Sequence, residues 1–212
     1  MAPAPPKPRP PALALVRPPS DDDDARLVEA LQRGDRDAPG RLFDRYGALV
    51  NRVLLRVLGG GADHDDRVQE AFILALRAVP TLRDAGALKP WITTIAVRVA
   101  RAELRRRRVR RFLHLAAPED LPDVAGDDDP AARDLLRETW RVLDTLPVDE
   151  RLAFTLRYVH GEELADVAAA CDCSLATVKR WLARAEQRFV AQCRTHPELA
   201  RRLAQGGRWS PP

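Results

Sequence analysis

The feature that most constrains this chain is a sharp separation of charge near its middle. Residues 98–111 hold eight arginines and a single acid, Glu103, whereas residues 113–132 hold six acids and neither lysine nor arginine. The acidic stretch also contains three prolines and a glycine, and like charge combined with Pro and Gly prevents a packed core and extends the chain. We therefore interpret residues 113–132 as a flexible acidic linker between two folded domains.

On both sides of this linker the sequence favours helices. Ala, Leu and Arg are abundant and are good helix formers, while aromatic residues make up only 5% of the chain. Apolar residues recur at spacings of three and four, as on the buried face of a helix. The expected helices start near Asp21–Asp24 and then span about 40–58, 63–79, from Pro90 into the arginine run, 133–145, 149–159, 163–171 and 175–193.

The prediction is an all-α protein with two small helical domains, residues 21–112 and 133–205. Residues 1–20 are rich in proline and basic, and we expect them and residues 206–212 to be disordered tails. No apolar run approaches the roughly 20 residues that span a bilayer, and no export signal is present. A cytoplasmic protein without membrane contact of its own is expected.

The residue patterns of catalytic and metal sites are absent from the sequence. It contains no Gly-rich phosphate loop, no nucleophile elbow and no His-rich metal motif, so we expect neither an enzyme nor a cofactor. Cys171 and Cys173 have the wrong spacing for a zinc knuckle, and an odd count of three cysteines argues against a disulfide framework. We expect no metal site and interpret the cysteines as small buried hydrophobes.

Residues 166–185 have the pattern of a helix-turn-helix, in which a second helix enters the major groove of DNA. Ala168 is small enough for two helices to cross closely, and Asp172 tolerates the left-handed backbone of the turn. Ser174 is a natural N-cap for a recognition helix whose outer face is basic. The residues predicted to contact DNA there are Ser174, Thr177, Lys179, Arg180 and Arg184.

A second basic surface is expected on the helix that follows Pro90. Arg98, Arg101, Arg105 and Arg108 are spaced by three and four, so they form one stripe that can neutralise several phosphates. The alternatives for this stripe are a basic tail that binds any polyanion and an exposed solubilising face. The acidic linker reaches on the order of 65 Å when extended, and two basic domains on such a tether suggest a bipartite grip on duplex DNA.

Several segments together resemble the bacterial sigma factors of the extracytoplasmic-function type, over about residues 25–190. Residues 146–161, followed by the helix-turn-helix, look like the family's −35-binding domain. Residues 66–72 are similar to the segment that docks on the polymerase clamp, and residues 91–96, followed by the arginines, look like the −10 recognition helix. Asp172 departs from the family, which usually has Gly in this turn.

The resemblance implies an RNA polymerase sigma factor that binds core RNA polymerase and directs initiation at −35 and −10 promoter elements. It assigns polymerase binding to the segment containing Asp66, Gln69, Glu70 and Phe72, and −10 binding to Trp91, Arg98, Arg101, Arg105 and Arg108. The loop at 80–89 matches the one that captures a flipped base, which costs a few kcal/mol of unstacking. The linker matches the segment that threads toward the RNA exit path, and an anti-sigma factor is a further possible partner.

Two other classes of protein remain open from the residues alone. One is a freestanding helix-turn-helix transcriptional regulator that uses residues 21–112 for dimerisation or sensing. The other is a thiol or metal sensor built on Cys171, Cys173 and His160.

Overall fold

A computed structural model describes residues 21–113 and 130–204, and all of its regular structure within these ranges is helical. The all-α prediction is therefore confirmed. The predicted tails at 1–20 and 206–212 and the central part of the predicted linker, 114–129, lie outside the described residues. No helix among the described residues is both long and apolar enough to cross a bilayer.

The N-terminal module consists of four α-helices. They are α1 (Asp21–Gln32), α2 (Ala38–Leu58), α3 (His64–Ala78) and α4 (Leu88–Phe112), with two short 3₁₀ turns, η1 (Val79–Thr81) and η2 (Ala85–Ala87), before α4. The apolar faces of α2 and α4 form the centre of its core, where Leu42, Leu54 and Ile92 are fully buried. Gly59 ends α2 in the left-handed region at φ 82°, as expected for a helix C-cap.

A buried polar contact fixes α1 on α2. The Tyr46 hydroxyl donates to Asp24 Oδ2 at 2.6 Å, and Arg45 Nε lies 2.6 Å from the other carboxylate oxygen of Asp24. Asp24 is buried, so both of its oxygens need such partners. This contact sets where α1 crosses the module.

The C-terminal module comprises the remaining helices. They are α5 (Pro130–Thr145), α6 (Val148–Phe154), the π-helix η3 (Thr155–His160), α7 (Leu164–Cys171), α8 (Leu175–Cys193) and α9 (Pro197–Ala204). Pro147 separates α5 from α6, as its sequence position indicates. Two features were not expected from the sequence: η3 continues α6 as a π-helix, and α9 packs on α5 and α8.

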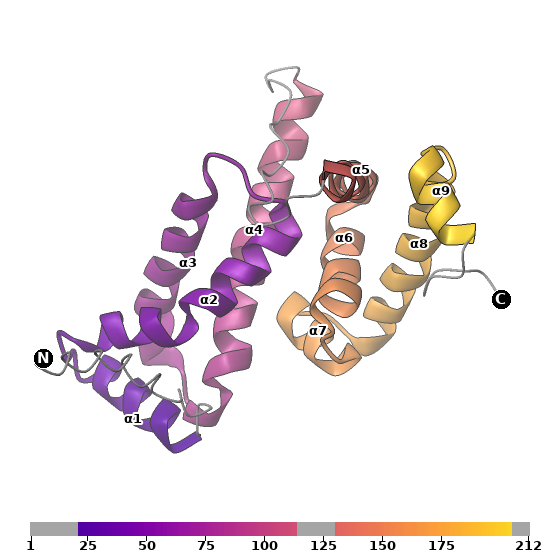
Figure 1. Cartoon of the computed structure of the whole chain (residues 1–212). Helices are drawn as coiled ribbons and strands as arrows, with labels where there is room; N and C mark the ends of the chain where they lie inside the picture. The colour runs from indigo at the N-terminus through magenta and orange to yellow at the C-terminus, as the bar shows by residue number, and fades with distance from the viewer. Residues whose placement is uncertain (1–20, 114–129, 205–212) are drawn as a thin grey trace, which may run out of the picture.

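The two modules pack against each other along α4. Figure 1 shows α4 with α1–α3 on one side and α6–α8 on the other, and α4 contacts both α6 and α7. The cluster of buried apolar side chains is continuous from Leu54 and Ile92 of the first module to Leu152, Leu156 and Val167 of the second. The separation of charge along the sequence suggested that the linker holds the two domains apart. In the structure the two modules instead share an apolar core.

Candidate nucleic-acid interface

The turn between α7 and α8 is closed by backbone hydrogen bonds. Asp172 adopts φ 55°, ψ 52°, its N–H donates to the carbonyl of Ala169 at 3.2 Å, and the N–H of Cys173 donates to that of Ala168 at 3.0 Å. This pair of bonds is the Schellman arrangement, which normally places Gly at the left-handed position. Asp is among the few other residues that adopt this conformation at low cost. The predicted turn residue is therefore confirmed.

The recognition helix α8 begins at a capped and exposed end. The Ser174 side chain accepts a hydrogen bond from the Thr177 N–H at 3.2 Å, which confirms the predicted N-cap. Val178 and Leu182 point inward and are buried, while the side chains on the opposite face are open to solvent. Three cationic side chains lie on that open face, at Lys179, Arg180 and Arg184. The first turns of α8 thus present positive charge and exposed donors outward.

The arginine stripe of α4 lies partly beneath the C-terminal module. Arg98 is 61% exposed and approaches Asp172 at 4.0 Å, but Arg101 is only 16% exposed. Arg101 Nε lies 3.0 Å from Asp149 Oδ1, and its Nη2 donates to the carbonyl of Cys171 at 3.0 Å. Arg105 and Arg108 are exposed. Sequence spacing identified the stripe but gave no sign that α6 and α7 cover one end of it.

Trp91 and the preceding loop flank the beginning of α4. Trp91 is half-buried and packs on the apolar core, so only part of its ring is accessible. The loop is fixed on α1, because the amide of Gln32 donates to the carbonyl of Leu82 at 3.0 Å. Within the loop, Asp84 Oδ1 accepts from the N–H of Gly86 at 2.9 Å. The segment predicted to receive a flipped base is thus held at both ends, by α1 and by α4.

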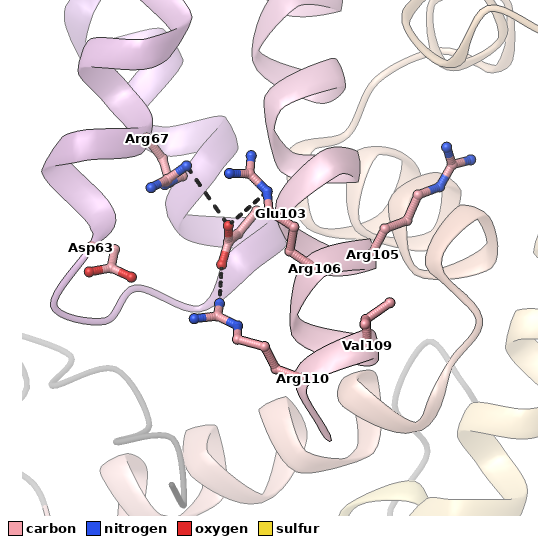
Figure 2. Close-up of a pocket in the computed structure, with 7 residues that line it drawn as sticks. All are labelled: Asp63, Arg67, Glu103, Arg105, Arg106, Val109 and Arg110. Carbon is pink, nitrogen blue, oxygen red and sulfur yellow. Dashed lines mark hydrogen bonds and ion pairs between the residues drawn. The ribbon is translucent and has the colours of Figure 1, made fainter. Parts of the chain in front are cut away.

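Glu103, the single acid of the arginine run, is the centre of an ion-pair cluster. Its side chain is 4% exposed and lies 2.9 Å from Arg110, 3.1 Å from Arg107 and 3.6 Å from Arg106. Figure 2 shows Arg67 of α3, Arg106 and Arg110 converging on this carboxylate, whereas Arg105 points away from it. These residues line a surface cavity of about 520 Å³ between α3 and α4. Part of the arginine run therefore stabilises the fold.

The residues predicted to bind polymerase lie along α3. Asp66 and Gln69 are exposed, and Glu70 is half-buried, 2.6 Å from Arg67 and 3.5 Å from Arg106. Phe72 is buried, and its ring packs at 5.0 Å between centroids on the ring of Phe43. Phe43 is 53% exposed and covers Phe72. The large apolar side chains presented to solvent here thus include Phe43 of α2 as well as Ile73 and Leu74 of α3, and the sequence did not predict that Phe43 would lie beside α3.

The thiols of Cys171 and Cys193 are buried. Burial raises the pKa of Cys171 to about 12 and that of Cys193 to about 11, so both remain protonated near neutral pH. Cys173 is half-buried and packs on the core. Within residues 21–113 and 130–204, no three His, Cys, Asp or Glu side chains are grouped to hold a metal ion.

Comparison with known proteins identifies both modules. The family model for sigma-70 region 2 matches residues 42–110, and that for sigma-70 region 4 matches residues 136–189. The ECF RNA polymerase sigma-E factor of Escherichia coli K12 is 33% identical over 174 residues, covering 77% of this chain and 91% of that protein. The chain belongs to the extracytoplasmic-function (ECF) sigma factors of bacterial RNA polymerase.

A further relative and two solved structures are similar to this sigma factor. The RNA polymerase sigma-H factor of Pseudomonas aeruginosa is 30% identical over 176 residues, covering 78% of this chain and 91% of that protein. The structure of CnrH in complex with the cytosolic domain of CnrY has a TM-score of 0.58 at 22% identity, over 82% of this chain and 98% of the other. The sigma factor RpoE of Bartonella quintana, solved with the anti-sigma factor NepR, has a TM-score of 0.54 at 20% identity, over 84% and 99%.

These matches decide between the classes of protein that the sequence left open. A freestanding regulator would use residues 21–112 for dimerisation or sensing, whereas residues 42–110 match sigma-70 region 2. The protein is an RNA polymerase sigma factor, which acts with core polymerase at promoter DNA. The buried, protonated Cys171 and Cys193 also fit structural positions better than a thiol sensor.

Proposed function

We propose that this sigma factor reads the −35 element with the first turns of α8. The observation that carries this assignment is the capped, solvent-exposed start of α8, where Ser174 and Thr177 fix the helix end. Lys179, Arg180 and Arg184 then extend from the open face. Arginine can donate two hydrogen bonds to guanine, and Lys or Arg can neutralise phosphates beside the groove.

Run-off transcription with core polymerase tests this assignment. The double variant Lys179→Ala, Arg180→Ala is expected to reduce −35-dependent transcripts at least tenfold, since two contacts of about 1–3 kcal/mol are removed. Arg194→Ala is the matched control, because Arg194 is an exposed cation beyond the other end of α8. Equal losses of transcript in the double variant and in Arg194→Ala would contradict the proposal, as would loss of polymerase binding in the double variant.

For the −10 element we propose α4, with Trp91 at its start and Arg98, Arg101, Arg105 and Arg108 along one side. Arg105 and Arg108 are exposed, whereas Arg101 is 16% exposed and pairs with Asp149 of α6. If α4 and α8 together neutralise about six phosphates, log K for promoter DNA falls with log salt at a slope near −5. A flat response to salt would exclude this footprint.

For core polymerase we propose the outer surface of α3, with Asp66 and Gln69 exposed and Glu70 beside them. Phe43 and the underlying Phe72 supply the apolar part of the same region. Asp66→Ala combined with Gln69→Ala is expected to weaken core binding in a pull-down with purified polymerase. Glu29→Ala, an exposed acid of α1, is the control, and binding of promoter DNA by the holoenzyme that still forms should be unchanged.

In this proposal the chain contributes binding and positioning, and RNA synthesis is left to the polymerase. It acts in the cytoplasm with that enzyme, and an anti-sigma factor is a candidate partner because two similar folds were solved with CnrY and NepR. An anti-sigma factor that covers α3 or α4 would compete with core polymerase. Competition between the two for purified sigma factor tests this directly, and simultaneous binding without loss would contradict it.

A further inference from the structure

The cavity between the start of α3 and the second half of α4 has the size and the charge of a site for a small anion (Figure 2). Its volume of about 520 Å³ lies in the range of about 300–1,000 Å³ that is typical of small-molecule sites. Arginines outnumber acids in its lining by four to two: the residues are Asp63, Arg67, Glu103, Arg105, Arg106, Val109 and Arg110. An excess of positive charge in a concave space attracts anions from solution.

The arginines of this cavity carry more donors than the buried carboxylate of Glu103 can pair. That carboxylate is shared by Arg67, Arg106 and Arg110, and Arg107 binds it as well. A carboxylate accepts at about four lone-pair positions, whereas every guanidinium carries several N–H donors. Arg106 and Arg110 are 49% and 48% exposed, so both can bind a further anion while they remain beside Glu103.

One donor in the wall of the cavity is removed from water without an acceptor. Nε of Arg67 is buried and has no hydrogen-bond partner among residues 21–113 and 130–204, although Nη1 of the same side chain lies 2.6 Å from Glu70. A buried N–H without an acceptor costs free energy, and native proteins rarely keep such a group unsatisfied. An anion bound against Arg67 would supply the missing acceptor.

The directions of the side chains favour a small, flexible anion over duplex DNA. Arg106 and Arg110 turn inward to Glu103, whereas Arg105 points away from it (Figure 2). The rigid backbone of a duplex meets side chains that point outward, while a short chain of phosphates can enter the cavity. Beside the arginines, Val109 is 57% exposed and supplies an apolar surface, and the planar guanidinium of Arg105 can stack on an aromatic ring. A ligand with both phosphates and a base would use both kinds of surface.

We propose that this cavity binds a nucleoside polyphosphate, with adjoining phosphates on Arg67, Arg106 and Arg110 and the base against Val109. Arginine binds phosphate oxygens through charge-assisted hydrogen bonds, which are about twice as strong as those between neutral groups. Adjoining phosphates can contact arginines of both α3 and α4, so the ligand joins the two helices. Of the residues proposed above for DNA and polymerase, only Arg105 lines the cavity, and the site is therefore a separate one.

Isothermal titration calorimetry on the full chain tests the class of ligand with three probes: ATP, AMP and inorganic tripolyphosphate. ATP should bind at least about tenfold more tightly than AMP, because adjoining phosphates reach more of the arginines. It should also bind about two- to fivefold more tightly than tripolyphosphate, because the base adds contacts with Val109 and Arg105. Equal binding of ATP and AMP, or no binding of any probe, would overturn the site. Tripolyphosphate binding as tightly as ATP would overturn the placement of a base in it.

Two matched pairs of variants test the position of the site. Arg110→Ala should weaken ATP binding at least about tenfold, as for loss of a hydrogen bond to a charged group. Arg111→Ala, the loss of an exposed cation next along α4 that does not line the cavity, should weaken it less than about twofold. Equal weakening in these two variants would mean that ATP binds the diffuse charge of the arginine run, and would overturn the proposal.

The second pair leaves every arginine in place, so the partners of Glu103 are unchanged. Val109→Glu adds a negative charge in the lining and should weaken ATP binding at least about fivefold. Phe112→Glu adds the same charge at an exposed position of α4 outside the cavity and should have a much smaller effect. Thermal melting followed by circular dichroism confirms that each variant is folded, and ATP should raise the melting temperature of the parent protein and of Phe112→Glu but not that of Val109→Glu. The same shift in all three would contradict binding at this cavity.

Discussion

Glu103 and Arg107 lie one turn apart on α4 and form an ion pair, 3.1 Å from Oε1 to Nε, in which the carboxylate is almost wholly buried. Arg107 also donates to the carbonyl of Leu58 at 2.8 Å, so the pair joins α4 to the end of α2. Arg67 from α3 and Arg106 and Arg110 from α4 share the same carboxylate. One acid thus connects three helices.

Removal of this acid should destabilise the N-terminal module. Glu103→Ala leaves several guanidinium groups without a counter-charge beside a buried site, and we expect a loss of about 3 kcal/mol in the free energy of unfolding. Urea denaturation followed by circular dichroism measures it. Glu198→Ala removes an exposed acid that pairs with Arg201 on α9 and should cost less than about 0.5 kcal/mol. Similar effects of the two variants would contradict the role given to Glu103.

A second prediction concerns the hydroxyl of Tyr46, which donates to the buried Asp24. Tyr46→Phe removes this bond and should cost about 1–2 kcal/mol, as for a hydrogen bond to a charged group. Burial and the bond to Asp24 also raise the pKa of Tyr46 to about 12. The folded protein therefore holds this proton more tightly than the unfolded chain, so its contribution to stability is lost as pH rises from about 10 to 12. Phenolate absorbance is followed during an alkaline titration of the parent protein and of Tyr46→Phe. The difference between the two shows whether Tyr46 loses its proton near pH 12, as expected, or near pH 10.

We expect His160 to make the stability of the folded protein depend on pH in the acid range. Burial, with Arg56 and Arg52 nearby, lowers the pKa of His160 to about 4. The unfolded chain binds this proton near pH 6.5, whereas the folded protein does not. The contribution of neutral His160 to the free energy of unfolding is therefore fully present above about pH 6.5 and is lost as the pH falls from about 6.5 to 4. Thermal unfolding across this range should show the loss, and His160→Gln should remove part of the pH dependence. An unchanged pH profile in His160→Gln would count against this assignment.

The cap of the recognition helix provides a fourth test. Ser174→Ala removes the acceptor for the Thr177 N–H and should cost about 1 kcal/mol of stability. Because fraying of the first turn displaces Lys179 and Arg180, −35-dependent transcription should fall as well. Thr195→Ala, at the other end of the helix, is the control, since the Thr195 hydroxyl donates to the carbonyl of Gln192 at an exposed site. Run-off assays and thermal melting together distinguish local fraying of α8 from a general loss of folding.

The features predicted correctly from the sequence are mostly local ones. The Ser174 cap, the left-handed Asp172 and the end of α2 at Gly59 depend on a few neighbouring residues, and each is as expected. The family resemblance added the identity of both modules, which the arginine spacing alone did not decide.

The features that were missed depend on residues far apart in the chain. Arg101 meets Asp149 and the carbonyl of Cys171 only because α6 and α7 dock on α4. In the sequence Glu103 is one acid among many arginines. Its contact with Arg67 exists only because α3 packs beside α4 in the fold. Helical periodicity predicted one α-helix over 149–159, since the i→i+5 bonding of η3 leaves no distinct sequence pattern.

The position of Glu103 inside α4 also determines how the arginine run faces its surroundings. Arg106, Arg107 and Arg110 turn toward that carboxylate and are partly neutralised by it. Arg105 points away from the carboxylate (Figure 2), and Arg105, Arg108 and Arg111 are all exposed. The positive charge of α4 is therefore distributed unevenly around the helix, because Glu103 partly offsets the arginines on one side. An interior acid thus determines on which side of the helix the arginines keep their full positive charge.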